Sequence, residues 1–304
     1  MKYIAVLSFL VLICIFGYVV LRNKTLPTRS GRLSVSVSFY PLAYFTQRIG
    51  GDHVTVYTIT PSGVEPHDYE PTMQDIVHIE QSRLLILNGK GLESWGDKIR
   101  DTIAGSGTKI VVAGSSVDSQ TLIEDGIAKI DPHIWLSPVL AQQEVIAIEK
   151  SLSAVDPAYS AYYAQRAQQL IRDIAAVDAA YKTGLKRCDR RDFITSHAAF
   201  GYLAFAYGLH QESIAGLSPQ EEPSAKQLIA VTNFAKAHHI RYIFFETFAN
   251  PKLSDTIAQE VGAQTLVLDP IEHISPDAVR EGKTYLSLMR DNLNNLQIAL
   301  GCHE

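Results

Sequence analysis

Short apolar segments alternate with segments of helical spacing in both halves of the chain. The apolar segments are rich in β-branched residues, which is typical of buried strands. In the first half, the predicted strands cover residues 33–39, 54–60, 84–87 and 109–113, with helices from residue 72 and over 92–103. In the second half, they cover residues 193–195, 212–215, 242–246 and 265–268, with helices over 198–206, from 224, and over 280–299. This alternation predicts parallel βα units and therefore the α/β fold class.

The middle of the chain predicts one long helix instead of further βα units. No proline follows Pro157, and no glycine precedes Gly184, in this stretch. Apolar side chains recur there at spacings of three and four and mark one face: Tyr159, Tyr163, Ala167, Leu170, Ile174, Val177 and Tyr181. Such a helix would be on the order of 40 Å long. We therefore predict two α/β lobes with mostly parallel sheets, residues 33–155 and 187–304, joined by one long rigid helix, residues 156–186.

Residues 1–32 precede the first lobe as a separate N-terminal segment and linker. Residues 4–21 form a run without a charge, with Lys2 before it and Arg22 after it. This length lies between a long signal-peptide core and a short membrane span. The large Ile13 before Cys14 does not fit a lipidation site, and no small-x-small cleavage site is evident. We expect an uncleaved membrane anchor, with a cleaved signal peptide as the alternative; both imply export of the remaining chain.

Composition and charge exclude several classes of protein. The chain is 46% hydrophobic and 19% charged, which does not suit a disordered or collagen-like protein. Its formal net charge is -5, and no basic stripe with interleaved aromatic residues is present, so nucleic acid is not an expected partner. Outside the N-terminal run there are two cysteines, Cys188 and Cys302. In an oxidising compartment they would either pair, tying the C-terminal end to the second lobe, or remain two unrelated thiols.

Three of the ten histidines lie where a predicted strand passes into a helix. His67 is in the loop at residues 63–72, His133 is in the loop at residues 131–138, and His197 follows the strand at residues 193–195. Asp269 ends the strand at residues 265–268. Open α/β sheets place ligand-binding residues beyond the carboxyl ends of their strands. The four positions are thus equivalent candidates, two from each predicted lobe.

Three imidazoles and one carboxylate are donors that suit zinc, which takes about four ligands in a tetrahedral arrangement. The ligand form of histidine is neutral, so binding should weaken as the pH falls below roughly 6.5. Dispersed ligands have no diagnostic spacing, however. On the residues alone, a metal site and ordinary loop histidines remain equally open.

The sequence frames around these residues resemble the metal-binding proteins of zinc and manganese ABC importers. The similarity runs in order from about residue 33 to residue 300 and includes Glu222-Pro223-Ser224-Ala225-Lys226 and the stretch 244–270. The resemblance implies two α/β lobes bridged by a rigid helix, with a metal ion buried between them as the transported substrate. It implies His67, His133, His197 and Asp269 as ligands.

The same resemblance implies a membrane permease as partner and no enzymatic activity. Manganese-selective members tend to have glutamate where this chain has His197, and a third imidazole favours zinc. We therefore expect Zn²⁺, with Mn²⁺ or iron as the alternative. We also expect a monomer in the periplasm or at the cell surface, tethered to the membrane by residues 4–21.

The chain departs from the family pattern in two places. Residues 115–130 contain acidic residues but no histidine, whereas many zinc members have a long His-rich loop there. The N-terminus fits neither a lipid-anchored nor a fully secreted member. Some members have a glutamate that approaches the metal beside the first histidine. Here Glu65 lies two residues from His67, and we expect it to support the ligands without binding the ion.

Two further classes remain as rivals. A zinc hydrolase would need an open coordination position and a general base, for which Glu65 or Glu246 could serve. Four protein ligands would close the metal shell, which argues against catalysis. A surface adhesin on the same scaffold is the second rival, but the sequence has no added domain or repeat to support it.

Overall fold

The N-terminal lobe is built on a four-stranded parallel sheet with the strand order β2-β1-β3-β4. In the computed structural model its strands are β1 Leu33–Val37, β2 Val54–Thr58, β3 Leu84–Leu87 and β4 Lys109–Val112. The lobe's helices are α2 Tyr40–Gly50, α3 Met73–Gln81, α4 Gly96–Thr102 and α5 Pro138–Val155. All four residues of β3 are buried, as expected for a central strand of a parallel sheet.

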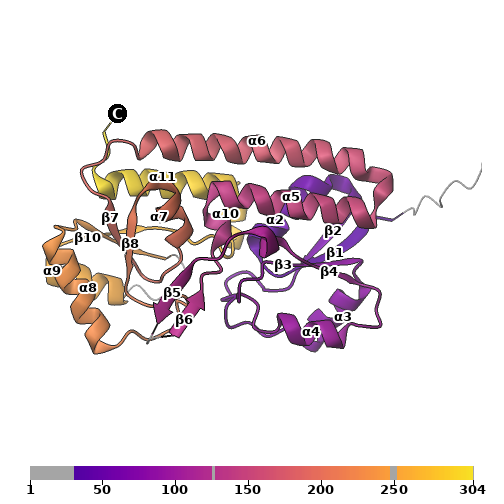
Figure 1. The fold of residues 1–304 in the computed structure, drawn as a ribbon, viewed down its shortest axis with the longest axis horizontal. Helices are drawn as coiled ribbons and strands as arrows, with labels where there is room; N and C mark the ends of the chain where they lie inside the picture. The colour runs from indigo at the N-terminus through magenta and orange to yellow at the C-terminus, as the bar shows by residue number, and fades with distance from the viewer. Residues whose placement is uncertain (1–30, 125–126, 247–251, 304) are drawn as a thin grey trace, which may run out of the picture. The chain divides into compact units, whose positions relative to one another are not determined.

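The C-terminal lobe repeats this topology. Its sheet has the order β10-β9-β7-β8, so its four strands, counted from β7, follow the same order as those of the first sheet. The strands are β7 Asp192–Thr195, β8 His210–Ser213, β9 Tyr242–Phe245 and β10 Gln264–Val267, and all of them pair in parallel. The helices are α7 Gly201–Tyr207, α8 Ala225–Ala237, α9 Lys252–Val261, α10 Pro276–Arg280 and α11 Tyr285–Leu300. The prediction of two α/β lobes with mostly parallel sheets is confirmed (Figure 1).

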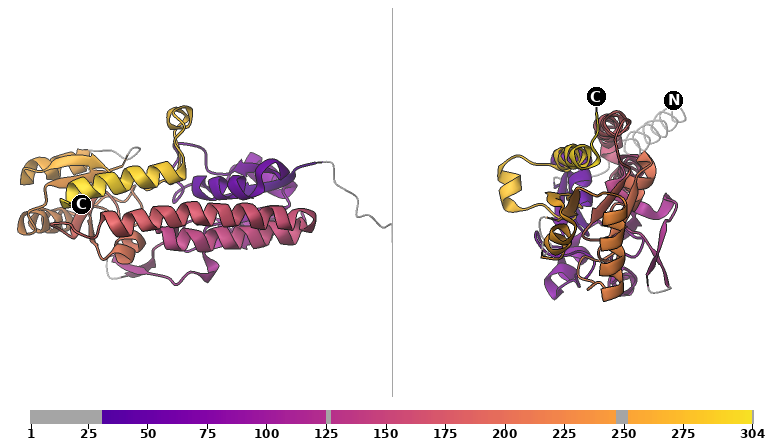
Figure 2. Two further views of the ribbon diagram at one scale, coloured as in Figure 1. Left: turned by 90° about the horizontal axis from the view of Figure 1, so that it is seen from above. Right: turned by 90° about the vertical axis from the view of Figure 1, so that its left-hand side faces the viewer.

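The predicted long helix is also confirmed, as α6 Ser160–Gly184. It packs against α2 and α5 of the N-terminal lobe and against α11 of the C-terminal lobe (Figures 1 and 2). Its buried residues are six of the seven predicted ones: Tyr163, Ala167, Leu170, Ile174, Val177 and Tyr181. The seventh, Tyr159, lies in the short 3₁₀ turn Pro157–Tyr159 that precedes the helix. The Tyr181 hydroxyl donates to the Met289 carbonyl oxygen, which fastens α6 to α11.

Two elements differ from the sequence-based expectation. An antiparallel hairpin, β5 Thr121–Glu124 and β6 Ile127–Ile130, lies in the stretch that had no predicted structure. The last helix, predicted from residue 280, begins at Tyr285 as α11, because Gly282 adopts a positive φ of 74° and Thr284 forms a capping box at the helix start; the short helix α10 before it was not predicted.

Cys188 and Cys302 form a disulfide, which resolves the alternative left open by the sequence. The backbone continues the pairing beside it, since the Asp189 amide donates to the Gly301 carbonyl oxygen. The bond therefore attaches the end of α11 to the segment that leads into β7.

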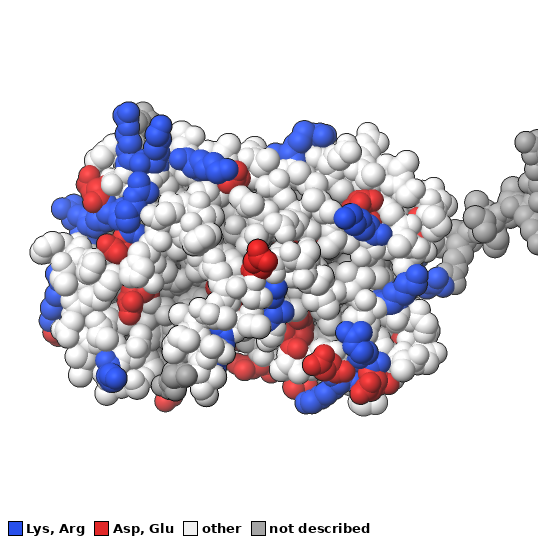
Figure 3. All heavy atoms as spheres, in the orientation of Figure 1, with Lys and Arg blue, Asp and Glu red and all other residues white. Residues whose placement is uncertain are grey.

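The structure describes residues 31–124, 127–246 and 252–303, and within them the stretch from Leu33 onward forms one compact unit. The predicted anchor at residues 4–21 lies outside the described residues. Among the helices that are described, none is both long and apolar enough to cross a membrane. The visible face in Figure 3 carries charged side chains of both signs toward its edges and mostly uncharged atoms across its middle.

Candidate metal centre

Three imidazoles and one carboxylate converge between the two lobes. The donor atoms of His67, His133, His197 and Glu272 all lie within 4.8 Å of one another. The Nε2 atom of His133 is 3.2 Å from that of His67 and 3.3 Å from that of His197. The Oε1 atom of Glu272 lies 3.4 Å from the Nε2 of His133, 3.5 Å from that of His67 and 3.6 Å from that of His197. In a tetrahedral zinc site with bonds of about 2.0–2.1 Å, neighbouring donors are about 3.3 Å apart, so these separations fit a zinc ion.

Each donor is placed by a loop that follows a strand. His67 lies after β2, His133 lies after the β5–β6 hairpin, and His197 follows β7 directly. Glu272 follows β10 after a turn in which Ile271 has a positive φ of 56°. A β-branched residue seldom adopts this conformation, so the turn is an unusual local feature. It brings the Glu272 carboxylate to the imidazoles, and each lobe thus contributes two donors.

Asp269, the carboxylate expected from the sequence, is not part of this group. Its Oδ1 accepts a hydrogen bond from the Ile271 amide at 2.7 Å, and its backbone is bonded in both directions to the Asn292 side chain. Asp269 lines a separate polar cavity of about 360 Å³ beside α11, together with Asp291 and Asn295. The structure thus brings Glu272 to the three imidazoles in the place where the sequence led us to expect Asp269, and Asp269 holds the turn that presents Glu272.

Burial and the mutual charges decide the protonation of the donors. Burial raises the pKa of Glu272, but hydrogen bonds from the three imidazoles outweigh it and hold that pKa well below its usual range. Burial lowers the pKa of His197, but the carboxylates of Glu246 and Glu272 raise it well above the ordinary value. For His67 burial prevails, and its pKa is lowered. The site thus combines an ionised Glu272 carboxylate with a His197 imidazole whose extra proton a cation would have to displace.

Two further carboxylates lie behind the imidazoles. Asp131 Oδ1 is 2.8 Å from His133 Nδ1, and Glu246 Oε1 is 2.5 Å from His197 Nδ1. Glu65 occupies a different position, since its Oε1 is 3.9 Å from His67 Nε2 and accepts the His67 amide. Burial, and next the charge of Glu272, raise the pKa of Glu65 to about 9. A neutral Glu65 that accepts a hydrogen bond from the His67 amide is compatible with the predicted role, in which Glu65 supports the ligands without binding the ion. That role stays a prediction.

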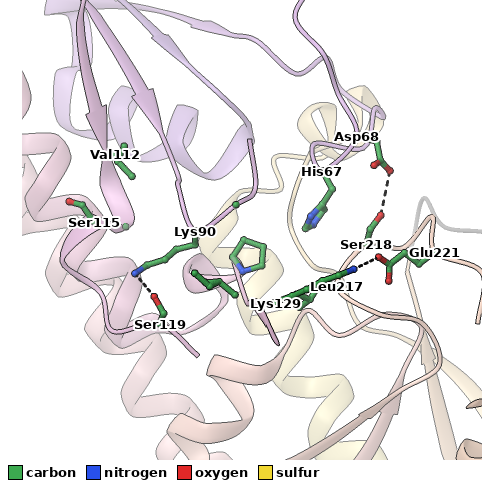
Figure 4. A pocket seen from close by; sticks show the side chains of 14 residues that line it. His67, Asp68, Lys90, Val112, Ser115, Ser119, Lys129, Leu217, Ser218 and Glu221 are labelled. Atoms are coloured by element: carbon green, nitrogen blue, oxygen red, sulfur yellow. Dashed lines mark hydrogen bonds and ion pairs between the residues drawn. The ribbon is translucent and has the colours of Figure 1, made fainter. Parts of the chain in front are cut away.

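A cavity of about 710 Å³ leads to His67 from the surface between the lobes (Figure 4). Its rim is crossed by two polar contacts between the lobes. The Lys129 ammonium lies 2.9 Å from a Glu221 carboxylate oxygen, and the Ser218 hydroxyl donates to Asp68 at 3.4 Å. His67 is the donor that lines this cavity, whereas His133 and His197 are fully buried. The cavity therefore reaches the group of four donors at His67.

Two lobes of equivalent topology with a buried site of three imidazoles and one carboxylate define a two-lobed, metal-binding α/β protein. The family model described as zinc-uptake complex component A, periplasmic, matches residues 35–299. The chain belongs to this family. The family recognised from the sequence is thereby confirmed.

Individual relatives agree with this assignment. The high-affinity zinc uptake system protein ZnuA of Bacillus subtilis (strain 168) is 37% identical over 284 residues, which cover 90% of this chain and 89% of the relative. The Zn(II)-bound structure of AdcA from Streptococcus pneumoniae has a TM-score of 0.78 at 36% identity and covers 89% of this chain. This chain spans 58% of that longer protein. A laminin-binding protein of Streptococcus agalactiae, described as having adhesin and metal transporting activity, has a TM-score of 0.82 at 32% identity, covering 89% of this chain and 100% of that protein.

Proposed function

We propose that this protein captures Zn²⁺ between its two lobes and delivers it to the membrane permease of an ABC importer. The observation that carries the proposal is the set of three Nε2 atoms and one Glu272 oxygen at tetrahedral spacing. Three imidazoles with a single carboxylate favour zinc over manganese, which prefers oxygen donors. The names of the relatives, which refer to zinc uptake and zinc binding, support the same ion.

The ligand set in this proposal is His67, His133, His197 and Glu272. Four protein donors leave no open position at which zinc could activate water, so the geometry favours a carrier over a hydrolase. A hydrolysis screen of the zinc-loaded chain checks this. Turnover that disappears in His67→Ala would contradict the carrier role.

We further propose that the protein acts outside the cytoplasm as a monomer, with residues 4–21 as its tether. The support is the uncharged run in the sequence and the family's periplasmic description. The proposed division remains residues 33–155 and 187–304 for the lobes, with residues 156–186 as the link. Fractionation of cells with an antibody to the chain, with and without alkaline extraction, tests the tether.

The central experiment is elemental analysis of the full chain purified without added metal, paired with a competition titration of zinc against manganese. We expect one zinc per chain and a preference for zinc. His197→Ala should lower zinc affinity by at least about tenfold, or about 1.4 kcal/mol. His78→Ala is the matched control, because His78 of α3 stacks on Tyr57 of β2 and is not part of the four-donor group; this variant should bind zinc like the parent. A preference for manganese would overturn the proposal.

A further inference from the structure

Glu246 joins the two strand ends that lie next to His197. It follows β9, and His197 follows β7, the strand that pairs with β9 through Ile194 and Ile243. Glu246 is 5% exposed, and its Oε1 accepts from the Ser196 hydroxyl as well as facing His197 Nδ1 at 2.5 Å. The Ser196 hydroxyl thus orients the Glu246 carboxylate, and the carboxylate in turn orients the His197 imidazole.

The contact determines which nitrogen of His197 can bind an ion. An imidazole that donates its Nδ1 proton to a carboxylate keeps Nε2 free as an acceptor or ligand. In His197 that Nε2 atom faces His133 and Glu272. A carboxylate behind a ligand imidazole also increases its basicity. Zinc gains more from a stronger nitrogen donor than manganese does, because manganese prefers oxygen ligands.

The three imidazoles are not supported equally. His133 has Asp131 behind it, but that contact lies within one loop, where the same Asp131 oxygen also accepts the His133 amide at 2.9 Å. The contacts of the described residues show no carboxylate at Nδ1 of His67. Glu246 is therefore the supporting carboxylate that comes from a separate strand. It acts on His197, the imidazole for which we expect a glutamate in a manganese-selective site.

We propose that Glu246 is a positioning residue that fixes His197 as an Nε2 ligand and thereby increases the selectivity of the site for zinc over manganese. This inference rests on the proposed function, since it takes His197 as a ligand. Glu246 itself lies at Nδ1 of the imidazole, whereas His133 and Glu272 lie at Nε2, and Glu246 is not part of the four-donor group.

Two substitutions separate the charge of Glu246 from its hydrogen bond. Glu246→Gln keeps an acceptor oxygen for Nδ1 but removes the charge, and it should lower zinc affinity about tenfold. Glu246→Leu removes both and should lower it about a hundredfold. Manganese affinity should fall by a clearly smaller factor in each variant. Glu144→Gln is the matched control, because Glu144 is a fully buried glutamate in α5 whose carboxylate accepts no hydrogen bond from the described residues and is not part of the four-donor group.

The measurements are competition titrations of the full chain with zinc and with manganese, visible spectra of the Co²⁺-loaded variants, and melting in chelator. We expect weaker or altered Co²⁺ bands in Glu246→Leu, with melting in chelator close to the parent. If Glu246→Leu does not fold, Glu246→Gln decides alone by the same criteria. Parent-like zinc affinity in the variants, or equal losses for zinc and manganese, overturns the proposal. Parent-like affinity in His197→Ala would instead refute the ligand set itself, so the two failures are distinguishable.

Discussion

Replacing Glu272 with glutamine tests the ligand assignment most directly. Glu272 is 2% exposed, and its Oε1 faces three imidazole nitrogens at 3.4, 3.5 and 3.6 Å. The change keeps the side-chain volume but removes the one anionic donor, leaving a divalent cation with three neutral ligands. We expect zinc affinity to fall by at least about a hundredfold, which corresponds to about 2.8 kcal/mol.

Asp269→Asn is the matched comparison, three residues earlier in the same loop. The asparagine oxygen can still accept from the Ile271 amide, so the turn that presents Glu272 should persist. Burial raises the pKa of Asp269 to about 6, so the substitution removes a charge that is only weakly favoured there. We expect zinc affinity to stay within about threefold of the parent, or about 0.7 kcal/mol.

A chelator competition titration measures both variants, and a thermal shift with zinc gives an independent reading. Saturation at a thousand times the dissociation constant stabilises a protein by about 4 kcal/mol, so a weakened variant should show a clearly smaller shift. Melting in chelator reports whether each variant folds. The reasoning is refuted if Asp269→Asn loses as much affinity as Glu272→Gln, or if Glu272→Gln binds zinc like the parent.

Three further outcomes follow from the structure. Zinc binding should release protons at pH 7 and weaken as pH falls. The reason is that burial lowers the pKa of His197, but the neighbouring carboxylates raise it well above its ordinary value. Calorimetry in buffers of different ionisation enthalpy measures the proton release, and its absence would contradict this reasoning. Replacing Cys188 and Cys302 with serine should lower the unfolding free energy by up to about 4–5 kcal/mol, because the disulfide spans 114 residues; an unchanged urea midpoint would contradict this. Glu144→Gln should become increasingly stable relative to the parent as pH rises above 4.5, by about 1.4 kcal/mol per pH unit, because burial raises the pKa of the native Glu144 and only the unfolded parent ionises in this range; a constant difference between pH 5 and 7 in urea unfolding would refute it.

The sequence predicted the fold well where a hydrophobic pattern has one structural solution. The stripe on α6 has helical spacing, and the buried strands alternate with helices, so both lobes and their link could be inferred. The β5–β6 hairpin could not, because Ile123, Ile127 and Ile130 are exposed and no buried face marks its strands. The later start of α11, at Tyr285 instead of residue 280, did have a signal, in Gly282 followed by Thr284 two residues later.

The candidate site was predictable in its imidazoles but not in its carboxylate. Each of the three histidines stands in a loop before a helix, at a position where an α/β lobe commonly places a ligand-binding residue. The choice between Asp269 and Glu272 depends on the backbone at Ile271, whose positive φ is rare for a β-branched residue. A local reading of the sequence favours the strand end itself and so selects Asp269. Only the turned backbone shows that the carboxylate three residues later reaches the imidazoles.

The division of donors between the lobes has a consequence for release of the ion. His67 and His133 belong to the N-terminal lobe, and His197 and Glu272 belong to the C-terminal lobe, so neither lobe alone completes a tetrahedral shell. If each donor is worth at least about a factor of ten, separating the lobes at the site weakens binding by about a hundredfold or more. A permease that draws the lobes apart at this site would therefore release zinc without a fall in the surrounding pH.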